Sequence, residues 1–529
     1  MINLEIDGKK IDVSTGSTIL EAANMLGIHI PTLCFSEKYD HHTSCMVCMV
    51  KDKRTGNILP ACSTQVEAGM IIESDTDDIK KVRRETLEFL LSEHSGDCEA
   101  PCTLACPAHI NIPLMIEQIR ISKLEEALKT VLDSVPFPSI LGRLCPTPCE
   151  RVCRRGVYDD PVSICLLKQY VGDKGLEKRL LVNSGRKSFL KEKVAIIGAG
   201  PAGLSASYYL SLEGYRCTIY EKQGFPGGKL RVSIKSGRLP LGIFEQEIDI
   251  IRKMGVHFEM NTVLGKDISL KELEADYDAV ILAIGDLAQN EIVLSDIKID
   301  NNRIYINKNF ETSKKGVFAC GAAVKHMKMA VKAMAEGKSA AEYTKRHIMG
   351  KVYGDNSKLF YSRFGKLSKD EIEGLLEDAQ FVSRTKPVSG DTVGFIVGEA
   401  EREASRCIQC QCLKADKCKL RLYAMVYKAK QPKLWINKRK NVKRIKSHPG
   451  IIYEPSKCIK CGLCIRISQT EQEDTGFCFI GRGFNVEVGI PFNEQLKYAI
   501  KHTGGKCVEL CPTGALVNKN NLILKRWRE

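Results

Sequence analysis

The chain has 529 residues, so length alone predicts roughly three to five domains. Hydrophobic residues make up 43% and charged residues 27%, which excludes wholesale disorder. The 23 cysteines are too many for packing alone, in a chain too long to be a small disulfide-linked domain. No charged leader precedes the first strand-like segment, and glycines and a proline interrupt the most apolar stretch, 194–212. We therefore predict a cytoplasmic metalloprotein without a membrane span.

The formal net charge is +15, which would ordinarily favour an acidic partner or nucleic acid. This count treats every cysteine as neutral, whereas a four-iron cluster on four thiolates carries a net charge of about −2. Several clusters would therefore cancel most of the excess. The remaining basic run, 428–446, is predicted to be a solvated face or a docking strip for an acidic redox partner, and no nucleic-acid binding is expected.

The first segment, 1–93, begins with alternating apolar residues on both sides of Asp7-Gly8, which predict a hairpin. Thr18 and Glu21 then predict a capped helix. Four cysteines follow with gaps of ten, two and thirteen residues, which favours a [2Fe-2S] cluster over a zinc site with two close pairs. The predicted ligands are Cys34, Cys45, Cys48 and Cys62. The segment resembles the β-grasp ferredoxin domain that opens the large iron–sulfur subunit of respiratory complex I and of iron-only hydrogenases.

The second segment, 94–190, carries two groups of cysteines separated by an apolar stretch with helical spacing at 112–132. Neither group alone supplies enough ligands for two four-iron clusters, so the groups must interleave. The candidate ligands are His94, Cys98, Cys102, Cys106, Cys145, Cys149, Cys153 and Cys165.

This second segment resembles the N-terminal domain of the glutamate synthase small subunit and of dihydropyrimidine dehydrogenase. The resemblance implies a helical domain with two [4Fe-4S] clusters, one on Cys98, Cys102 and Cys153 and the other on Cys106, Cys145 and Cys149. The family's first cysteine is absent. His94 is spaced like the histidine ligand of the complex I subunit, so we expect it to be the missing ligand. Lys168, a poor ligand, stands where the family often has Gln or Glu, which makes Cys165 the better candidate for the second cluster.

The third segment, 191–350, presents a strand, a Gly-x-Gly-x-x-Gly turn, an apolar helix, a second strand and an acidic residue in that order. This order predicts a Rossmann-like nucleotide site in which the glycines admit a pyrophosphate and Glu221 binds ribose. Resemblance to the glutamate synthase small-subunit family implies FAD, although Ala322 replaces an acidic residue of that family. The predicted contacts are Gly198, Ala199, Gly200, Pro201, Ala202, Gly203, Glu221, Lys222, Gly228, Lys229, Arg238, Val263, Gly285 and Gly321.

That family inserts a complete second Rossmann unit for NADPH between the segments that correspond to Gly285 and Gly316. This chain has only about thirty residues there, with no second glycine-rich turn. We therefore predict that the chain has no NAD(P) site of its own.

Two further cysteine groups lie near the C-terminus. In segment 351–450, four cysteines within twelve residues predict one site, a [4Fe-4S] cluster or alternatively zinc. In segment 451–529, a Cys-x-x-Cys-x-x-Cys run and a distant Cys-Pro predict one [4Fe-4S] cluster in a ferredoxin-like domain that resembles the insert of complex I's large subunit. The predicted ligands are Cys407, Cys410, Cys412 and Cys418 for the first site, and Cys458, Cys461, Cys464 and Cys511 for the second.

Together these segments predict a multidomain α/β and α+β protein that holds one FAD, one [2Fe-2S] cluster and four [4Fe-4S] clusters. No catalytic residues are predicted, because the cofactors carry the chemistry. The resemblances imply an electron-transfer subunit of an anaerobic multi-subunit oxidoreductase, with a complex I-like NADH-oxidising flavoprotein, ferredoxin or other oxidoreductase subunits as partners. Two alternatives are a glutamate synthase-like small subunit beside a large amidotransferase chain and a redox-sensing scaffold without turnover.

Overall fold

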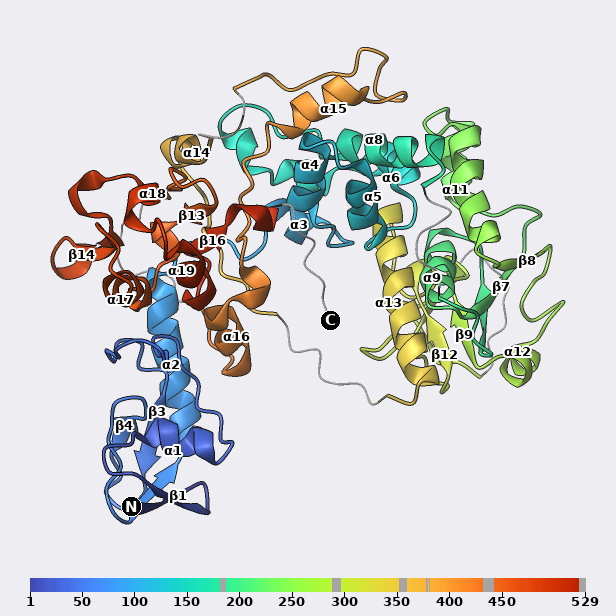
Figure 1. The fold of residues 1–529 in the computed structure, drawn as a ribbon. Coiled ribbons are helices and arrows are strands. Elements are labelled where there is room, and N and C mark those ends of the chain that lie inside the picture. The colour runs from blue at the N-terminus through green and yellow to red at the C-terminus, as the bar shows by residue number, and fades with distance from the viewer. Residues whose placement is uncertain are drawn as a thin grey trace. The chain divides into compact units, whose positions relative to one another are not determined.

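The fold was taken from a computed structural model, which describes residues 1–180, 187–287, 296–351, 359–376, 379, 381–431 and 442–522 (Figure 1). The chain forms two compact units, and neither is continuous in sequence. Unit 1 comprises Met1–Ala100, Asn356–Asp378 and Cys410–Glu529, and unit 2 comprises Pro101–Asp355 and Ala379–Gln409. The predicted 351–450 segment is therefore divided between the two units.

Unit 1 opens with a five-stranded sheet of order β2-β1-β5-β3-β4, in which only β1 and β5 are parallel. Asp7 and Gly8 both have positive φ, which suits the tight turn of the predicted β1–β2 hairpin. Helix α1 carries the predicted capping box of Thr18 and Glu21 and packs on the sheet core. The elements are β1 (Ile2–Ile6), β2 (Lys9–Val13), α1 (Ile19–Met25), β3 (Met49–Asp52), β4 (Ile58–Pro60) and β5 (Met70–Glu73).

The long helix α2 (Asp77–Glu93) follows this sheet, and its buried Arg83 donates to Met49 O at 2.8 Å. The C-terminal part of unit 1 contains two small antiparallel sheets, β13-β16 and β14-β15, with short helices around them. Its elements are α14 (Lys369–Leu376), α16 (Lys419–Val426), β13 (Ile451–Tyr453), α17 (Leu463–Thr470), β14 (Cys478–Ile480), β15 (Glu487–Gly489), α18 (Leu496–Ala499), α19 (Gly504–Leu510), β16 (Leu516–Asn518) and the 3-10 turns η5 (Ala415–Lys417), η6 (Pro455–Lys457), η7 (Gly483–Asn485), η8 (Pro491–Asn493) and η9 (Lys519–Leu522).

Unit 2 begins with a helical layer in which α6 and α8 approach closely. Added Cβ atoms at Gly142 and Gly172 would overlap the backbone of the facing helix, so only glycine permits this packing. The elements are α3 (Pro101–Ala105), α4 (Ile112–Arg120), α5 (Leu124–Leu132), α6 (Pro138–Leu144), α7 (Pro148–Arg151), η1 (Arg154–Val157), α8 (Ile164–Glu177) and α15 (Val397–Ala404).

The rest of unit 2 is a parallel five-stranded sheet of order β12-β9-β6-β7-β8, as the Rossmann-like pattern predicts. The described part of the segment between Gly285 and Gly316 contains only the two-stranded β10–β11 pair. The elements are β6 (Lys193–Ile197), α9 (Pro201–Leu212), β7 (Arg216–Glu221), α10 (Leu230–Lys235), α11 (Leu241–Lys253), β8 (His257–Met260), α12 (Leu270–Asp276), β9 (Ala279–Leu282), β10 (Ile299–Asp300), β11 (Arg303–Ile304), β12 (Val317–Ala319), η4 (Gly321–Ala323) and α13 (Ala330–Ile348).

No helix within the described ranges is long and apolar enough to cross a membrane.

Candidate iron–sulfur and flavin sites

The four N-terminal cysteines are all buried and form two close pairs. The sulfurs of Cys48 and Cys62 lie 3.1 Å apart, and the hydrogen bond from Cys48 lowers the pKa of Cys62 to about 6. A hydrogen bond from Cys45 likewise lowers the pKa of Cys34 to about 5. The structure therefore brings the predicted [2Fe-2S] ligands together in two pairs, which suits this cluster.

His41 is a neighbour of this site that the sequence did not single out. Its Nε2 lies 2.9 Å from the Cys62 sulfur, and the hydroxyl of Thr43 lies 3.7 Å from the same sulfur. Hydrogen bonds to ligand sulfurs tune cluster potentials, so His41 is placed to modulate this site. The only signal in the sequence is its position inside the loop between the first two cysteines.

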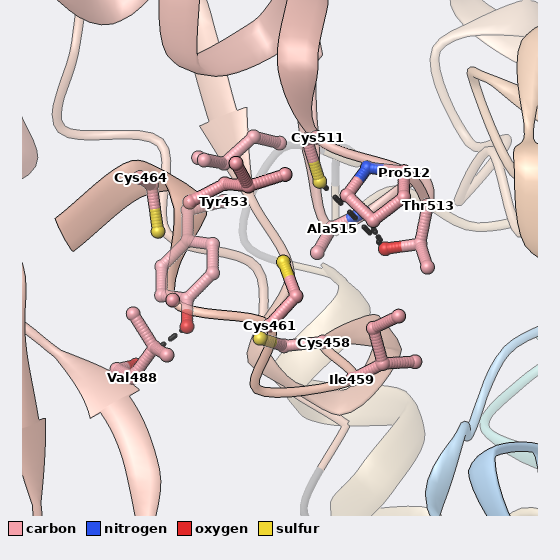
Figure 2. A pocket seen from close by; sticks show the side chains of 13 residues that line it. Tyr453, Cys458, Ile459, Cys461, Cys464, Val488, Cys511, Pro512, Thr513 and Ala515 are labelled. Carbon is pink, nitrogen blue, oxygen red and sulfur yellow. Dashed lines mark hydrogen bonds between the residues drawn. The ribbon is translucent and has the colours of Figure 1, made fainter. Parts of the chain in front are cut away.

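The C-terminal cysteines surround one cavity (Figure 2). Two come from the turn that leads into α17, the third lies in the first turn of α17, and the fourth follows α19. Gly462 supplies the left-handed turn at φ 71° that brings the run round, and the N–H of Lys460 donates to the Cys458 sulfur at 3.3 Å. Apolar side chains such as Tyr453 and Leu516 line the rest of the cavity. This chemistry fits a [4Fe-4S] cluster on Cys458, Cys461, Cys464 and Cys511.

Ser468 stands where a two-cluster ferredoxin would have a further cysteine. It is buried, donates to Ile465 O at 2.9 Å and accepts from the N–H of Phe477 at 3.1 Å. Its hydroxyl is therefore committed to local structure, consistent with one cluster in this domain.

The N-terminal and C-terminal cysteine sites belong to the same unit and share a residue. The buried Arg466 of α17 donates to Cys34 O at 2.8 Å and to Cys461 O at 3.4 Å. Both cysteines belong to one hydrophobic core, together with Leu33 and Leu463. Sites at opposite ends of the sequence are thus held together by one guanidinium group.

In unit 2, Cys106, Cys145 and Cys149 line a second cavity with Lys168. The Cys165 thiol hydrogen-bonds with those of Cys145 and Cys149, and Lys168 Nζ lies 3.8 Å from the Cys165 sulfur. The structure thus places Cys165 with the three cysteines that were expected to lack a fourth.

Burial disfavours the charged form of Lys168, but the surrounding thiols outweigh burial and raise its pKa above the usual value. Lys168, which is a poor cluster ligand, therefore places a buried positive charge beside the thiolates. This role was not evident from the sequence.

The remaining cysteines are divided between the two units. Cys98 lies in unit 1, whereas Cys102 and Cys153 lie in unit 2. Burial raises the pKa of Cys98 to about 11, with a further rise from the Cys412 thiol beside it. Burial raises the pKa of Cys418 to about 12, and the thiols of Cys412 and Cys98 contribute to this rise. Cys98, Cys412 and Cys418 are therefore neighbours within unit 1.

Cys407 belongs to unit 2, in the part of the chain that follows α15. Arg406, directly before it, is fully buried and lies close enough to the half-buried Cys153 to influence the pKa of that thiol. Within the described residues, no three Cys, His, Asp or Glu side chains converge tightly enough to hold a single metal ion.

The glycine-rich turn has the geometry that a dinucleotide requires. Gly198 has φ 106° and packs against Ala283 O, where a Cβ would overlap. Gly200 faces open space, with nothing within 4 Å of an added Cβ. Gly200 is also the N-cap of α9, whose N-terminus carries the partial positive charge that suits a pyrophosphate. The turn therefore fits a bound dinucleotide.

Glu221 ends β7 beside this turn, as expected. One carboxylate oxygen accepts from the N–H of Ala199 at 2.7 Å, and the other accepts from Gln223 at 2.9 Å. In the turn after β12, the carbonyl of Ala322 accepts from Arg303 at 2.8 Å, and Arg303 also donates to Asp286 at 2.7 Å. The carboxylate of Asp286 therefore lies near Ala322, a position where the family usually has an acidic residue.

Five family descriptions match successive parts of the chain. They are the 2Fe-2S iron-sulfur cluster binding domain (1–77), dihydropyrimidine dehydrogenase domain II with a 4Fe-4S cluster (78–180), an NAD(P)-binding Rossmann-like domain (196–250), pyridine nucleotide-disulphide oxidoreductase (240–337) and the ferredoxin-like domain of NADH-quinone oxidoreductase subunit 3 (448–517). The chain is a multidomain protein of iron–sulfur and oxidoreductase domains. This result confirms the predicted fold class, the predicted resemblances and the presence of both kinds of iron–sulfur domain.

Several curated proteins are similar to about a third of the chain. NADPH-Fe(3+) oxidoreductase subunit beta of Geobacter sulfurreducens is 47% identical over 35% of this chain and 28% of its own length. NADP(+)-dependent formate dehydrogenase subunit beta of Moorella thermoacetica is 40% identical over 35% of this chain and 29% of its own length. The glutamate synthase [NADPH] small chain of Bacillus subtilis is 35% identical over 36% of this chain and 39% of its own length. The chain thus spans well under half the length of each of these relatives.

Proposed function

We propose that this chain is an electron-transfer subunit of a multi-subunit oxidoreductase, with one FAD, one [2Fe-2S] cluster and four [4Fe-4S] clusters. The observation that carries the proposal is the gathering of cysteine sets from distant parts of the sequence in unit 1, where Arg466 joins the first set to the last. When bound, clusters supply one-electron transfer and a flavin exchanges one or two electrons. The protein's own part is to hold, space and shield these groups.

The proposal assigns nucleotide oxidation to a partner. The parallel sheet of unit 2 provides one glycine-rich turn, and we assign it to FAD. A flavin accepts hydride only from a nicotinamide ring stacked on it, which normally requires a second Rossmann unit. We infer that this nucleotide site belongs to a cytoplasmic partner that resembles the NADH-oxidising flavoprotein of complex I, or that ferredoxin replaces it. Relatives named as subunits of NADPH- and NADP(+)-linked enzymes support an assembly of this kind.

Cofactor content is the first test. Protein purified without oxygen should contain roughly eighteen irons and one FAD per chain, because one two-iron and four four-iron clusters are expected. Iron, acid-labile sulfide and released flavin are measured after full anaerobic reconstitution. A recovery of about ten irons would contradict the five-cluster assignment.

Nucleotide oxidation is the second test. The isolated chain, mixed anaerobically with NADH or NADPH, should keep its visible absorbance, whereas dithionite or reduced ferredoxin should bleach it. After the NADH-oxidising partner is added, NADH should also bleach the visible absorbance of the chain. Rapid bleaching of the isolated chain by NADPH would contradict the inference that this chain has no NAD(P) site of its own. Copurification with a large amidotransferase chain would support the glutamate synthase-like alternative instead.

A further inference from the structure

Cys98 is held against a short irregular stretch at 360–364 of the same unit. Its N–H donates to Ser362 O at 3.1 Å, and the N–H of Ser362 donates back to the Cys98 sulfur at 3.3 Å. The preceding Asp97 accepts from the N–H of Phe364 at 2.9 Å. A backbone N–H aimed at a buried sulfur stabilises its thiolate, which is the form that binds iron.

Arg421 joins this stretch to Cys418. Its guanidinium donates to Phe360 O at 2.9 Å and to a carboxylate oxygen of Glu99, next to Cys98, at 3.1 Å. Its backbone N–H donates to the Cys418 sulfur at 3.4 Å. The side chain of Arg421 therefore fixes the surroundings of Cys98, and its backbone N–H orients the Cys418 thiol.

Cys412 and Cys418 both pack on the turn after Cys511. The carbonyl of Pro512 accepts from the N–H of Leu420 at 3.3 Å and lies 3.7 Å from the Cys418 sulfur. A Cβ at Gly514 would overlap the Cys412 sulfur, so glycine is required for this thiol to keep its place. The two thiols thus contact the same turn of unit 1, at Pro512 and Gly514.

One ring nitrogen of His94 is held by a backbone carbonyl. Its Nδ1 lies 3.0 Å from Lys457 O, and a carbonyl can only accept, so Nδ1 carries the proton. In the neutral ring Nε2 then keeps its lone pair, and histidine ligands typically donate their other nitrogen to a carbonyl in this way. Gly96 packs directly on the Lys457 side chain, which fixes the stretch from His94 to Cys98.

We propose that one four-iron site of unit 1 is built from His94, Cys98, Cys412 and Cys418. Cys98 then shares no cluster with Cys153, and the cysteines from 407 to 418 form no site by themselves. The inference rests on the proposed iron–sulfur content and changes only its grouping. The proposal concerns this site alone and leaves the predicted total of iron per chain unchanged.

Single and double variants distinguish the two groupings in the full chain. Cys98→Ala and Cys418→Ala should each remove the same cluster, with a loss of roughly four irons, and the double variant should lose no more than either single one. If the cysteines group by sequence instead, the double variant should lose two clusters and roughly eight irons. Iron analysis and low-temperature EPR spectra of the dithionite-reduced proteins provide the measurement. Cys478→Ala, which alters a half-buried cysteine outside every predicted site, is the control.

A measurement on the unaltered protein keeps the test independent of variant folding. One four-iron EPR signal should show nitrogen hyperfine coupling that changes when histidine is labelled with ¹⁵N. That signal should be the one absent from Cys418→Ala, and His94→Cys should keep the signal without its nitrogen coupling. Nitrogen coupling that persists in Cys418→Ala, or that no four-iron signal shows, would overturn the proposal. Wild-type protein with far fewer irons than expected would instead contradict the proposed function itself.

Discussion

Single residues in this protein compensate the charge of its cysteine sets. Lys168 is buried among four thiols, Arg466 lies between two sites, and Arg421 orients two more thiols. A buried cation stabilises nearby negative charge, and reduction adds one electron to a cluster. Such residues are therefore expected to raise the potential of the site that they face.

Replacement of Lys168 tests this expectation. Lys168→Met should lower the potential of one [4Fe-4S] cluster by about 59 mV or more, the equivalent of a tenfold shift in a one-electron equilibrium. The change is measured by EPR-monitored redox titration. Lys174→Gln, on the same helix and partly exposed, should leave every potential unchanged. Equal potentials in Lys168→Met and wild type would show that Lys168 does not act on the cluster.

At the scale of elements, a buried carboxylate links the nucleotide-binding sheet to the cluster-binding helices of unit 2. Glu247 of α11 accepts from the N–H groups of Ser139, at 2.8 Å, and Ile140, at 3.0 Å, at the start of α6. Two of the N–H groups that α6 leaves free at its N-terminus are satisfied in this way. The contact fixes one layer of unit 2 on the other.

This contact predicts a pH dependence. Burial raises the pKa of Glu247 to about 8 from a usual value of 4.5. A folded-state pKa above the unfolded one contributes stability that is complete below pH 4.5 and is lost as the pH rises toward 8. Glu247→Gln cannot titrate and leaves one N–H without an acceptor, which costs about 1–3 kcal/mol at low pH.

The apparent melting temperature of Glu247→Gln, measured anaerobically, should therefore lie below that of wild type at pH 5.5, with a smaller gap at pH 8.5. Glu245→Gln, on the exposed face of the same helix, is the matched control. A gap that widens with pH would contradict the assigned direction of the pKa shift.

At the scale of the whole molecule, the two ends of the sequence meet inside unit 1. The N-terminal domain and the C-terminal ferredoxin-like domain are joined by Arg466 and by a common apolar core. The entry and exit of electrons therefore cannot be assigned to opposite ends of the molecule on the basis of sequence order. Direction depends instead on the partner and on potentials.

Arg466→Met tests this junction. Loss of both donors leaves two buried carbonyls unsatisfied, at a cost of about 1–3 kcal/mol. Peptides from residues 31–48 and 457–468 should both exchange amide hydrogen faster, while the β1–β2 hairpin should keep its protection. Lys460→Gln, which removes only the partly exposed ion pair with Glu93, should leave both regions unchanged. Faster exchange in only one of the two peptides would show that Arg466 does not join them.

The sequence determined the local chemistry. The hairpin at Asp7-Gly8, the capping box of Thr18, the glycine-rich turn and the cysteine run from 458 to 464 follow from short-range spacing, because turns, caps and ligand loops depend on neighbouring residues. The fold class and the kinds of iron–sulfur domain could be predicted for the same reason.

Only the tertiary structure decided how distant residues are grouped. Lys168 became a buried countercharge, Arg466 connected the first and last cysteine sites, and Cys98 came to lie beside Cys412 and Cys418. Sequence spacing cannot show such neighbours, because their proximity depends on how whole elements pack. Burial and the direction of each N–H group arise at the same stage, so ligand identity across segments is a property of the packed chain.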